Sequence, residues 1–465
     1  MAINMDDTLQ YIFAHMEDSV FVTNFQGDVL YMNAGAEKLF GCQSIGHNIK
    51  LWQVIPIVER NDPLIQLFID ALRHREKSIQ VLTDYENADG TRFQLRVSIT
   101  CGGEDSPVFI VVISDLTRLF QVNSAFVRYT SPEIADYVLN SPEGSRQGGR
   151  RKEVSVLMSD LRGFTAISSR LSSENLIQML NDYFAVMSDI ISRYKGTIIE
   201  FLGDGIFVVF GAPNDLPSHA EAAISCALEM QNAMEQVNQR NRENGFPALE
   251  MGIGISSGAA TVGNIGSDKR MKFGCVGDSV NLAGRTESLT AGGQVLITEY
   301  TLSIMKEKPE IQHIRSFLPK GKEAPVLIYE ITGLGSIRLK TLPAGTPVWH
   351  DLACEVPFDF HLLEGKSVAV PLYRGTLLRL SDDGRDAWIR TEPHLSEMQN
   401  LVMETGEYTW GKVLSVSPEG TRLRFTFRPE AFDTWLADRI NSLSPIPPAN
   451  KDKDLHPLVQ QKEGC

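Results

Sequence analysis

The sequence Val154-Ser-Val-Leu-Met-Ser-Asp-Leu-Arg-Gly-Phe-Thr165 opens the stretch, residues 153–213, that decides the fold. Apolar runs predict strands, and apolar residues spaced by three and four positions predict a helix. The expected order is a strand at 154–158, a helix over 176–191, and a hairpin of strands 197–202 and 206–210. This order brings Asp160 beside Asp204 in the hairpin turn, although the two residues lie 44 positions apart (204 − 160).

Two carboxylates beside a glycine-rich turn make a site for a hard divalent cation. Mg²⁺ takes oxygen ligands, usually one or two carboxylates together with substrate phosphates. Gly163, Phe164 and Thr165 follow Asp160 into a helix, so their free backbone N–H groups are predicted to face phosphate oxygens. Taken singly, Asp160 could cap a helix and Asp204 could sit in an ordinary hairpin turn, but a third segment argues against that simpler interpretation.

The third segment reads Phe273-Gly-Cys-Val-Gly-Asp-Ser-Val-Asn-Leu-Ala-Gly-Arg285 and places Asn281 and Arg285 on one helix face. An amide and a planar guanidinium suit the stabilisation of charge at a phosphoryl group. Together these motifs resemble the catalytic domain of the class III nucleotidyl cyclases, which make cyclic AMP or cyclic GMP. The resemblance covers roughly residues 150–335, and its matching pieces are residues 159–165, 201–205, 276–281, Arg285 and 320–322.

The resemblance implies that the 3′-hydroxyl of a nucleoside triphosphate displaces pyrophosphate from its own α-phosphate, with two ions of Mg²⁺ or Mn²⁺ per site. It assigns the metal to Asp160, Leu161 and Asp204, the α-phosphate to Arg285, the ribose to Asn281, and the outer phosphates to Lys320, with Lys322 as a nearby alternative. In the family, one chain supplies the metal ligands and its partner supplies the Asn/Arg pair. A homodimer is therefore implied, and a monomer is expected to be inactive.

Hydrogen-bond polarity decides the base. The family's first specificity position lies four before the hairpin aspartate and is Glu200 here, whose carboxylate accepts from guanine N1–H and N2–H₂ and cannot donate to adenine N1. The second position is Gly274, so guanine O6 would need a backbone N–H or a water. A guanylyl cyclase using GTP is favoured. Glu200 could instead be only a solvated strand residue. The alternatives to this function are an adenylyl cyclase with an unusual purine pocket and a non-catalytic nucleotide or cyclic di-GMP receptor.

Composition limits the other classes of function. A chain of 465 residues exceeds one domain, and its net charge of −14 argues against a partner that is nucleic acid or an anionic membrane. The sequence contains no apolar run of 18 residues, and residues 1–20 lack the features of a signal peptide. The six cysteines form no Cys-x-x-Cys pair and predict reduced thiols in a cytoplasmic protein.

The chain divides into five predicted segments of an α+β protein. Residues 1–115 resemble a PAS sensor domain that could bind a small molecule, and residues 116–152 read as a helical signalling linker whose last part, 141–152, is flexible. Residues 153–335 are expected to form the ferredoxin-like βαββαβ catalytic domain. Residues 336–445 predict a small β-barrel, and residues 446–465 a disordered tail.

The predicted barrel resembles a PilZ-type domain, some members of which bind cyclic di-GMP. Those receptors carry an acidic or amide residue at a position where this chain has Arg379, before Ser381 and Gly384. The basic residue favours a structural version of the domain that has lost the ligand.

Overall fold

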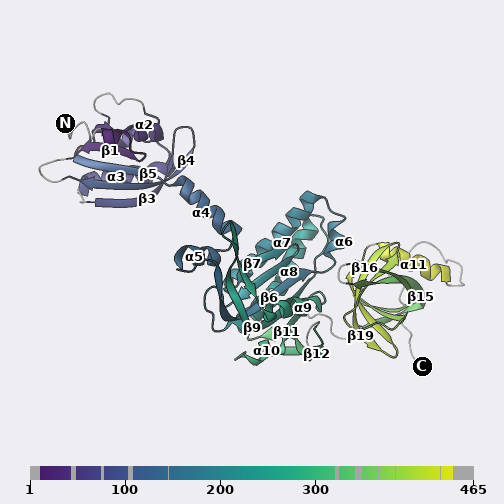
Figure 1. Ribbon diagram of the computed structural model, residues 1–465. Coiled ribbons are helices and arrows are strands. Elements are labelled where there is room, and N and C mark those ends of the chain that lie inside the picture. Colours follow the sequence, from purple (N-terminus) through teal and green to yellow (C-terminus); the bar gives the residue numbers. More distant parts are fainter. Residues whose placement is uncertain are drawn as a thin grey trace. The chain divides into compact units, whose positions relative to one another are not determined.

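The computed structural model describes residues 11–42, 49–74, 78–102, 108–144, 146–319, 324–340, 348–364, 367–382, 384–429 and 431–443. The chain forms two compact units, one ending at Thr130 and the other beginning at Ser131 (Figure 1). The predictions for Lys320, for Lys322 and for the tail at 446–465 lie outside the described residues. Within the described part of the chain, no helix is long and apolar enough to cross a membrane.

The first unit is a five-stranded antiparallel sheet in the order β2-β1-β5-β4-β3, flanked by helices. Its elements are β1 (Ser19–Asn24), β2 (Val29–Met32), α2 (Ala34–Phe40), α3 (Asp62–His74), β3 (Ser78–Glu86), β4 (Arg92–Cys101), β5 (Val108–Asp115) and α4 (Thr117–Tyr129). The Asn33 side chain caps α2, and Gly41 ends that helix in the left-handed conformation at φ +66°. Phe21, Phe68 and Phe109 fill the core. The strands predicted at 19–23, 29–32, 78–86, 92–99 and 108–114 are confirmed, whereas α3 was not predicted.

A mixed sheet in the order β12-β13-β11-β9-β6-β8-β7 forms the centre of the second unit. The elements that build the site are α5 (Pro132–Asn140), β6 (Gly148–Leu161), α6 (Phe164–Ser168), α7 (Ser173–Arg193), β7 (Thr197–Leu202), β8 (Gly205–Phe210), α8 (His219–Glu243), β9 (Met251–Ser267), β10 (Arg270–Val276) and α9 (Asp278–Ser288). The remainder are β11 (Val295–Thr298), α10 (Glu299–Ser303), β12 (Glu310–Phe317), β13 (Val326–Leu334) and β14 (Ile337–Arg338). The run β6-α7-β7-β8-α8-β9 is the predicted βαββαβ unit.

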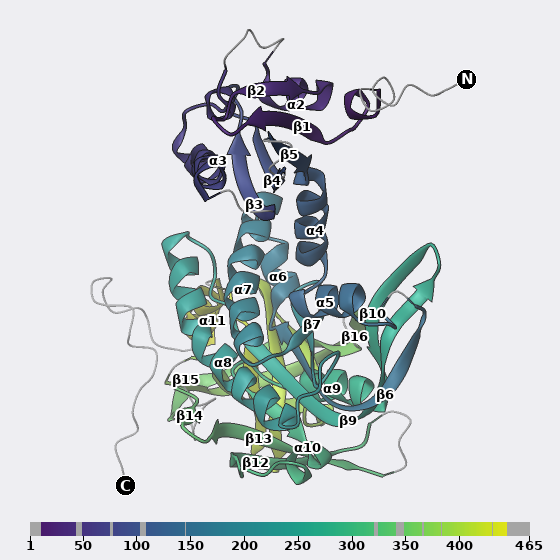
Figure 2. The same cartoon turned by 90° about the vertical axis from the view of Figure 1, so that its left-hand side faces the viewer.

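Both faces of this sheet are covered, as the alternation along β8 shows. Ile206, Val208 and Phe210 pack into a core with α7 and α8, whereas Phe207 and Val209 pack into a second core that includes Ala283 of α9. Figure 2 shows α7 and α8 side by side. Because strands β6 and β8 are held from both sides, the ends of these strands are rigid positions for functional side chains.

Two strands extend beyond their predicted limits. The prediction that residues 141–152 are flexible is wrong for the last five of them. Strand β6 begins at Gly148, which pairs with Asn264 of the antiparallel strand β9. A strand was also predicted over 249–255, ending at Ser256, but β9 continues through Ser256 and Ser257, since Ser257 Oγ lies 2.6 Å from Ser155 Oγ inside the core. Polar residues and glycines therefore belong to these strands because backbone pairing and buried hydroxyl contacts satisfy them.

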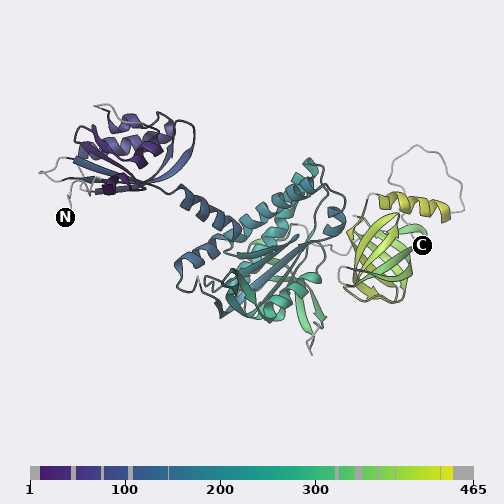
Figure 3. The ribbon, with the colours of Figure 1, turned by 45° about the horizontal axis from the view of Figure 1, so that its top comes forward.

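The C-terminal part of the second unit is a closed barrel in the order β15-β16-β17-β20-β19-β18. Its strands are β15 (Trp349–Glu364), β16 (Ser367–Ser381), β17 (Asp386–Glu392), β18 (Asn400–Thr405), β19 (Glu407–Ser417) and β20 (Gly420–Phe427). Helix α11 (Ala431–Leu443) lies beside the barrel (Figure 3). Its side chains Phe432, Leu436 and Ile440 belong to the barrel core. The barrel was predicted with strands at 368–372, 375–380, 387–391, 411–416 and 422–427. The first two of these form one strand, β16, and strands β15 and β18 were missed.

Candidate active site

Asp160 and Asp204 meet as predicted. Asp160 is the penultimate residue of β6, and Asp204 lies in the turn between β7 and β8. Ser159 pairs with Ile206, so Asp160 reaches the hairpin turn, and a side chain built on Gly205 would lie 3.5 Å from Asp160 Oδ1. Asp204 is 8% exposed, and both acids line one cavity of about 460 Å³.

The glycine-rich turn that follows Asp160 lines the same cavity. Gly163 adopts the left-handed conformation at φ +66° and begins the short helix α6. Phe164 and Thr165 also border the cavity, together with the predicted metal position Leu161. The carboxylate pair and the predicted phosphate-binding turn therefore share one space.

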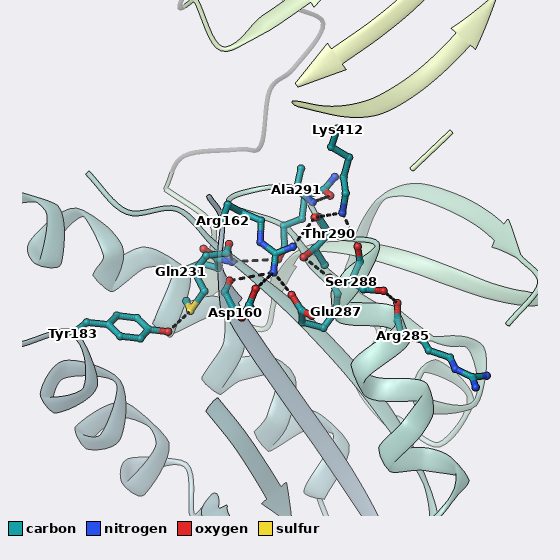
Figure 4. A network of polar contacts seen from close by, with 12 residues as sticks. Asp160, Arg162, Tyr183, Gln231, Arg285, Glu287, Ser288, Thr290, Ala291 and Lys412 are labelled. Atoms are coloured by element: carbon teal, nitrogen blue, oxygen red, sulfur yellow. Dashed lines mark hydrogen bonds and ion pairs between the residues drawn. The ribbon is translucent and has the colours of Figure 1, made fainter. Parts of the chain in front are cut away.

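A buried charge network that the sequence did not predict surrounds Asp160. Arg162 Nη2 lies 3.2 Å from Asp160 Oδ2 and also contacts the Glu287 carboxylate of α9 (Figure 4). The Arg162 side chain is 10% exposed and that of Glu287 is 14% exposed. Burial raises the pKa of Glu287, and the Arg162 charge opposes that rise. Arg162 and Glu287 are 125 positions apart, and no local sequence pattern marks them as partners.

Within one chain, Asn281 and Arg285 do not join the carboxylates. Both residues lie on α9 as predicted, but neither is among the residues that line the cavity. Figure 4 shows the Arg285 side chain pointing away from Asp160, and Asn281 is exposed. The site is therefore incomplete in a single chain if these two residues take part.

Comparison with known proteins identifies the two parts of this chain. A family model for the adenylate and guanylate cyclase catalytic domain matches residues 147–333, and a PAS domain model matches residues 7–75. Residues 147–333 therefore have the fold of a class III cyclase catalytic domain.

The relatives are named as both kinds of cyclase. "Adenylate cyclase 1" of Rhizobium meliloti (strain 1021) is 33% identical over 226 residues, which cover 48% of this chain and 33% of that protein. "Adenylate cyclase" of Anabaena cylindrica is 27% identical over 262 residues, 52% of this chain and 51% of that protein. The chain thus matches between a third and a half of the length of these curated relatives.

Solved structures give the same mixture of names. The guanylyl cyclase Cya2 is 45% identical, with 42% of this chain and 100% of that chain covered and a TM-score of 0.41. The adenylyl cyclase CyaB from P. aeruginosa is 37% identical, and the match covers 41% of this chain and 99% of that chain with a TM-score of 0.39. These names leave the base that this cyclase domain would take unassigned.

The two predicted base positions lie on β7 and β10 of the cyclase domain. Glu200 is 43% exposed, and its carboxylate contacts the ammonium of Lys272, which is 54% exposed. Gly274 is buried, and a Cβ at that position would lie 3.0 Å from Ile265 Cδ1. The contact with Lys272 was not predicted, because the two residues lie 72 positions apart and no local pattern links them.

Residues of the barrel also line the cavity of the cyclase domain, including Trp410, Lys412 and Thr426. Lys412 is 2% exposed, and its ammonium donates to the carbonyl oxygens of Ser288 at 2.6 Å and Thr290 at 2.9 Å. Burial, followed by the positive charge of Arg162, lowers the pKa of Lys412 to about 7.

The residues present fit a divalent cation bound together with its substrate. Among the described residues, no three His, Cys, Asp or Glu side chains converge on one point. Asp160 and Asp204 alone would leave most of an ion's coordination shell to phosphate and water oxygens, as is usual for Mg²⁺ in phosphoryl-transfer sites. The cyclase family generally uses divalent metals, and this donor set agrees with that chemistry.

Proposed function

We propose that this protein is a guanylyl cyclase that converts GTP to cyclic GMP and pyrophosphate. The observation that carries the cyclase reaction is the convergence of Asp160 and Asp204 on one cavity with the turn at Gly163. The carboxylate of Glu200 at the base position supports GTP over ATP, because it accepts from guanine N1–H and N2–H₂. An adenylyl cyclase is the second candidate, supported by the names of the two curated relatives.

The reaction forms a bond between the ribose 3′-oxygen and the α-phosphorus and breaks the bond from the α-phosphorus to the β-phosphate oxygen. The 3′-hydroxyl loses its proton, and pyrophosphate carries away the bonding electron pair. Asp160, Asp204 and the neighbouring Leu161 would hold two ions of Mg²⁺ or Mn²⁺, which supply Lewis acidity at the 3′-oxygen and the triphosphate. The protein contributes mainly position and charge.

The chain's own residues have distinct parts in this proposal. The backbone N–H groups of Gly163, Phe164 and Thr165 bind phosphate oxygens, and Lys320 is proposed to contact the outer phosphates. Asn281 orients the ribose, and Arg285 stabilises the charge at the α-phosphate. Because α9 holds this pair away from Asp160 in one chain, a second copy must supply it, and the active form is a homodimer. The PAS domain is proposed to regulate the reaction, with or without a small-molecule ligand.

The test uses the purified full-length protein with GTP or ATP and Mg²⁺ or Mn²⁺, measuring cyclic nucleotide and pyrophosphate. We expect a preference for GTP, and loss of turnover in Asp160→Ala and Asp204→Ala. Asp268→Ala is the matched control, because Asp268 is an exposed acid in the β9–β10 turn of the same domain. A preference for ATP would contradict the guanine assignment, and an active Asp204→Ala would contradict the site itself.

A further inference from the structure

The residues beside Gly274 supply a donor that the guanine pocket otherwise lacks. Phe273 and Cys275 of β10 are buried in the core at 7% and 6% exposure. Because side chains alternate along a strand, Lys272 shares the opposite face with Gly274. The Lys272 ammonium extends across to β7 and contacts the Glu200 carboxylate. A positive donor therefore lies beside the proposed base acceptor, on the face where Gly274 has no side chain.

This pair matches the edge of guanine. Guanine offers N1–H and N2–H₂ as donors and O6 as an acceptor, while a carboxylate only accepts and an ammonium only donates. We propose that Lys272 is a specificity-determining residue that donates to guanine O6 while Glu200 accepts from N1–H and N2–H₂. Adenine carries an amino group in place of O6, so Lys272 would face another donor. This inference rests on the proposed guanylyl cyclase function and adds a second residue that recognises the base.

The contact between Glu200 and Lys272 does not prevent guanine from entering. Both side chains are about half exposed, and exposed ion pairs contribute only about 0–1 kcal/mol. Opening the pair is therefore inexpensive, and a base that engages both groups restores their hydrogen bonds. A base that engages only one of them leaves the other without its partner, which costs affinity.

The test compares Lys272→Met and Lys272→Arg in the full-length protein, with Lys269→Met as the control from the same exposed hairpin. The substrates are GTP and the triphosphate of 2-aminopurine riboside, which retains the 2-amino group but lacks both O6 and the N1–H. We expect Lys272→Met to lower kcat/KM for GTP about 10- to 100-fold, the range for a hydrogen bond to a charged group. It should leave the analogue nearly unchanged, and Lys272→Arg should recover much of the loss.

Two outcomes would overturn this role of Lys272. An unchanged kcat/KM for GTP in Lys272→Met would show that Lys272 is only an exposed partner of Glu200. An equal loss for GTP and the analogue would show a general effect on the pocket. The wild-type preference between GTP and ATP reports separately on the proposed function, so failure of the function and failure of this residue role are distinguishable.

A different observation concerns the predicted phosphate turn, which the barrel covers. A Cβ on Gly163 would lie 2.7 Å from the carbonyl oxygen of Thr426 and 2.9 Å from Phe427 Cβ, so β20 is in contact with the turn. Arg170, just beyond α6, lies over the Phe427 ring at 4.8 Å and forms an ion pair with Glu407 of β19. On the other side of the cavity, Lys412 donates to the carbonyls of Ser288 and Thr290.

We infer that the barrel is an autoinhibitory cover that must separate from the turn before a triphosphate can bind there. The inference rests on the proposed cyclase reaction but not on the choice of base. The contacts have unequal strengths. Lys412 is buried, whereas Arg170 and Glu407 are 45% and 50% exposed. An exposed ion pair of this kind contributes about 0.2–1 kcal/mol, so removing it shifts the covered state only slightly and leaves the fold intact.

Charge reversal in the full-length protein tests the cover. We expect Arg170→Glu and Glu407→Arg each to raise turnover with the preferred nucleotide about two- to fivefold, the factor that corresponds to the ion-pair energy. The double variant should return toward the wild-type rate. Arg390→Glu is the control, because Arg390 of β17 forms an ion pair of similar exposure with Glu355 of β15, both within the barrel domain. Unchanged or lower turnover in both single variants, or a double variant that does not return, would overturn the inference.

Discussion

Replacing Glu287 by glutamine should weaken metal binding, although Glu287, which lines the same cavity, is not one of the proposed metal ligands. Arg162 contacts both Asp160 and Glu287, so its positive charge is shared between two carboxylates. Glutamine keeps the shape and a hydrogen-bond acceptor but removes one of the two negative charges. Arg162 then pairs more strongly with Asp160 alone, and a divalent ion must compete with it for that carboxylate.

The magnitude follows from the burial of the network. Arg162 and Glu287 are 10% and 14% exposed, so solvent screens them little. Arg162 stays charged in the variant, so its hydrogen bond to the glutamine side chain remains charge-assisted and only the attraction between the two opposite charges is lost, about 1–2 kcal/mol. That change raises the half-saturating metal concentration about 5- to 30-fold. Alanine is a poorer choice, because removing one partner of a buried pair costs about 3–5 kcal/mol of stability.

The assay is turnover against the concentration of Mg²⁺ or Mn²⁺ at saturating nucleotide, with thermal unfolding measured in parallel. Glu229→Gln is the control, since Glu229 pairs with Arg193 at 2.6 Å in the same domain but does not line the cavity. If Glu287→Gln lowers the unfolding temperature but leaves the metal concentration at half-saturation unchanged, the coupling through Arg162 is refuted.

Three further predictions test the dimer, the core and the response to pH. Mixing equal amounts of Asp204→Asn and Arg285→Ala, each inactive alone, should restore about a quarter of wild-type turnover, because half the dimers are mixed and each has one intact site; no recovery would contradict the shared site. Phe210→Ala should cost about 3–5 kcal/mol in urea unfolding, since Phe210 is 0% exposed, whereas Ile177→Ala at 59% exposure on α7 should cost far less. His219 Nδ1 lies 2.8 Å from Ser155 Oγ, and burial lowers its pKa against the opposing charges of Glu153 and Glu221. As pH falls below about 6.5, the unfolded state therefore binds the proton before the folded state does, and the stability present above that pH is lost. His219→Gln should lose less of its free energy of unfolding than the wild type when unfolding is measured across that pH range.

The features that the sequence predicted best are those fixed by local periodicity. The helix from Ser173 to Arg193 and the helix from Asp278 to Ser288 follow from the three- and four-residue spacing of their apolar or functional positions. The meeting of Asp160 with Asp204 follows from the strand order. The limits of β6 and β9 were missed because glycines and serines signal loops when read alone, while pairing along fourteen residues of β6 outweighs that preference.

The charge network around Asp160 could not be predicted, and the reason is physical. Arg162 follows Asp160 by two positions, but whether it pairs with a carboxylate, a phosphate or solvent depends on what α9 and the barrel place around it. Glu287 lies in the last turn of α9, and Lys412 comes from a barrel strand 250 positions beyond Arg162 (412 − 162). Such groups are recognised only when their burial is known, because a buried charge is stable only when it is paired with an opposite charge or hydrogen-bonded. The carboxylates of the proposed site are thus encoded locally, whereas the strength with which they would hold a cation is set by residues that only the fold assembles.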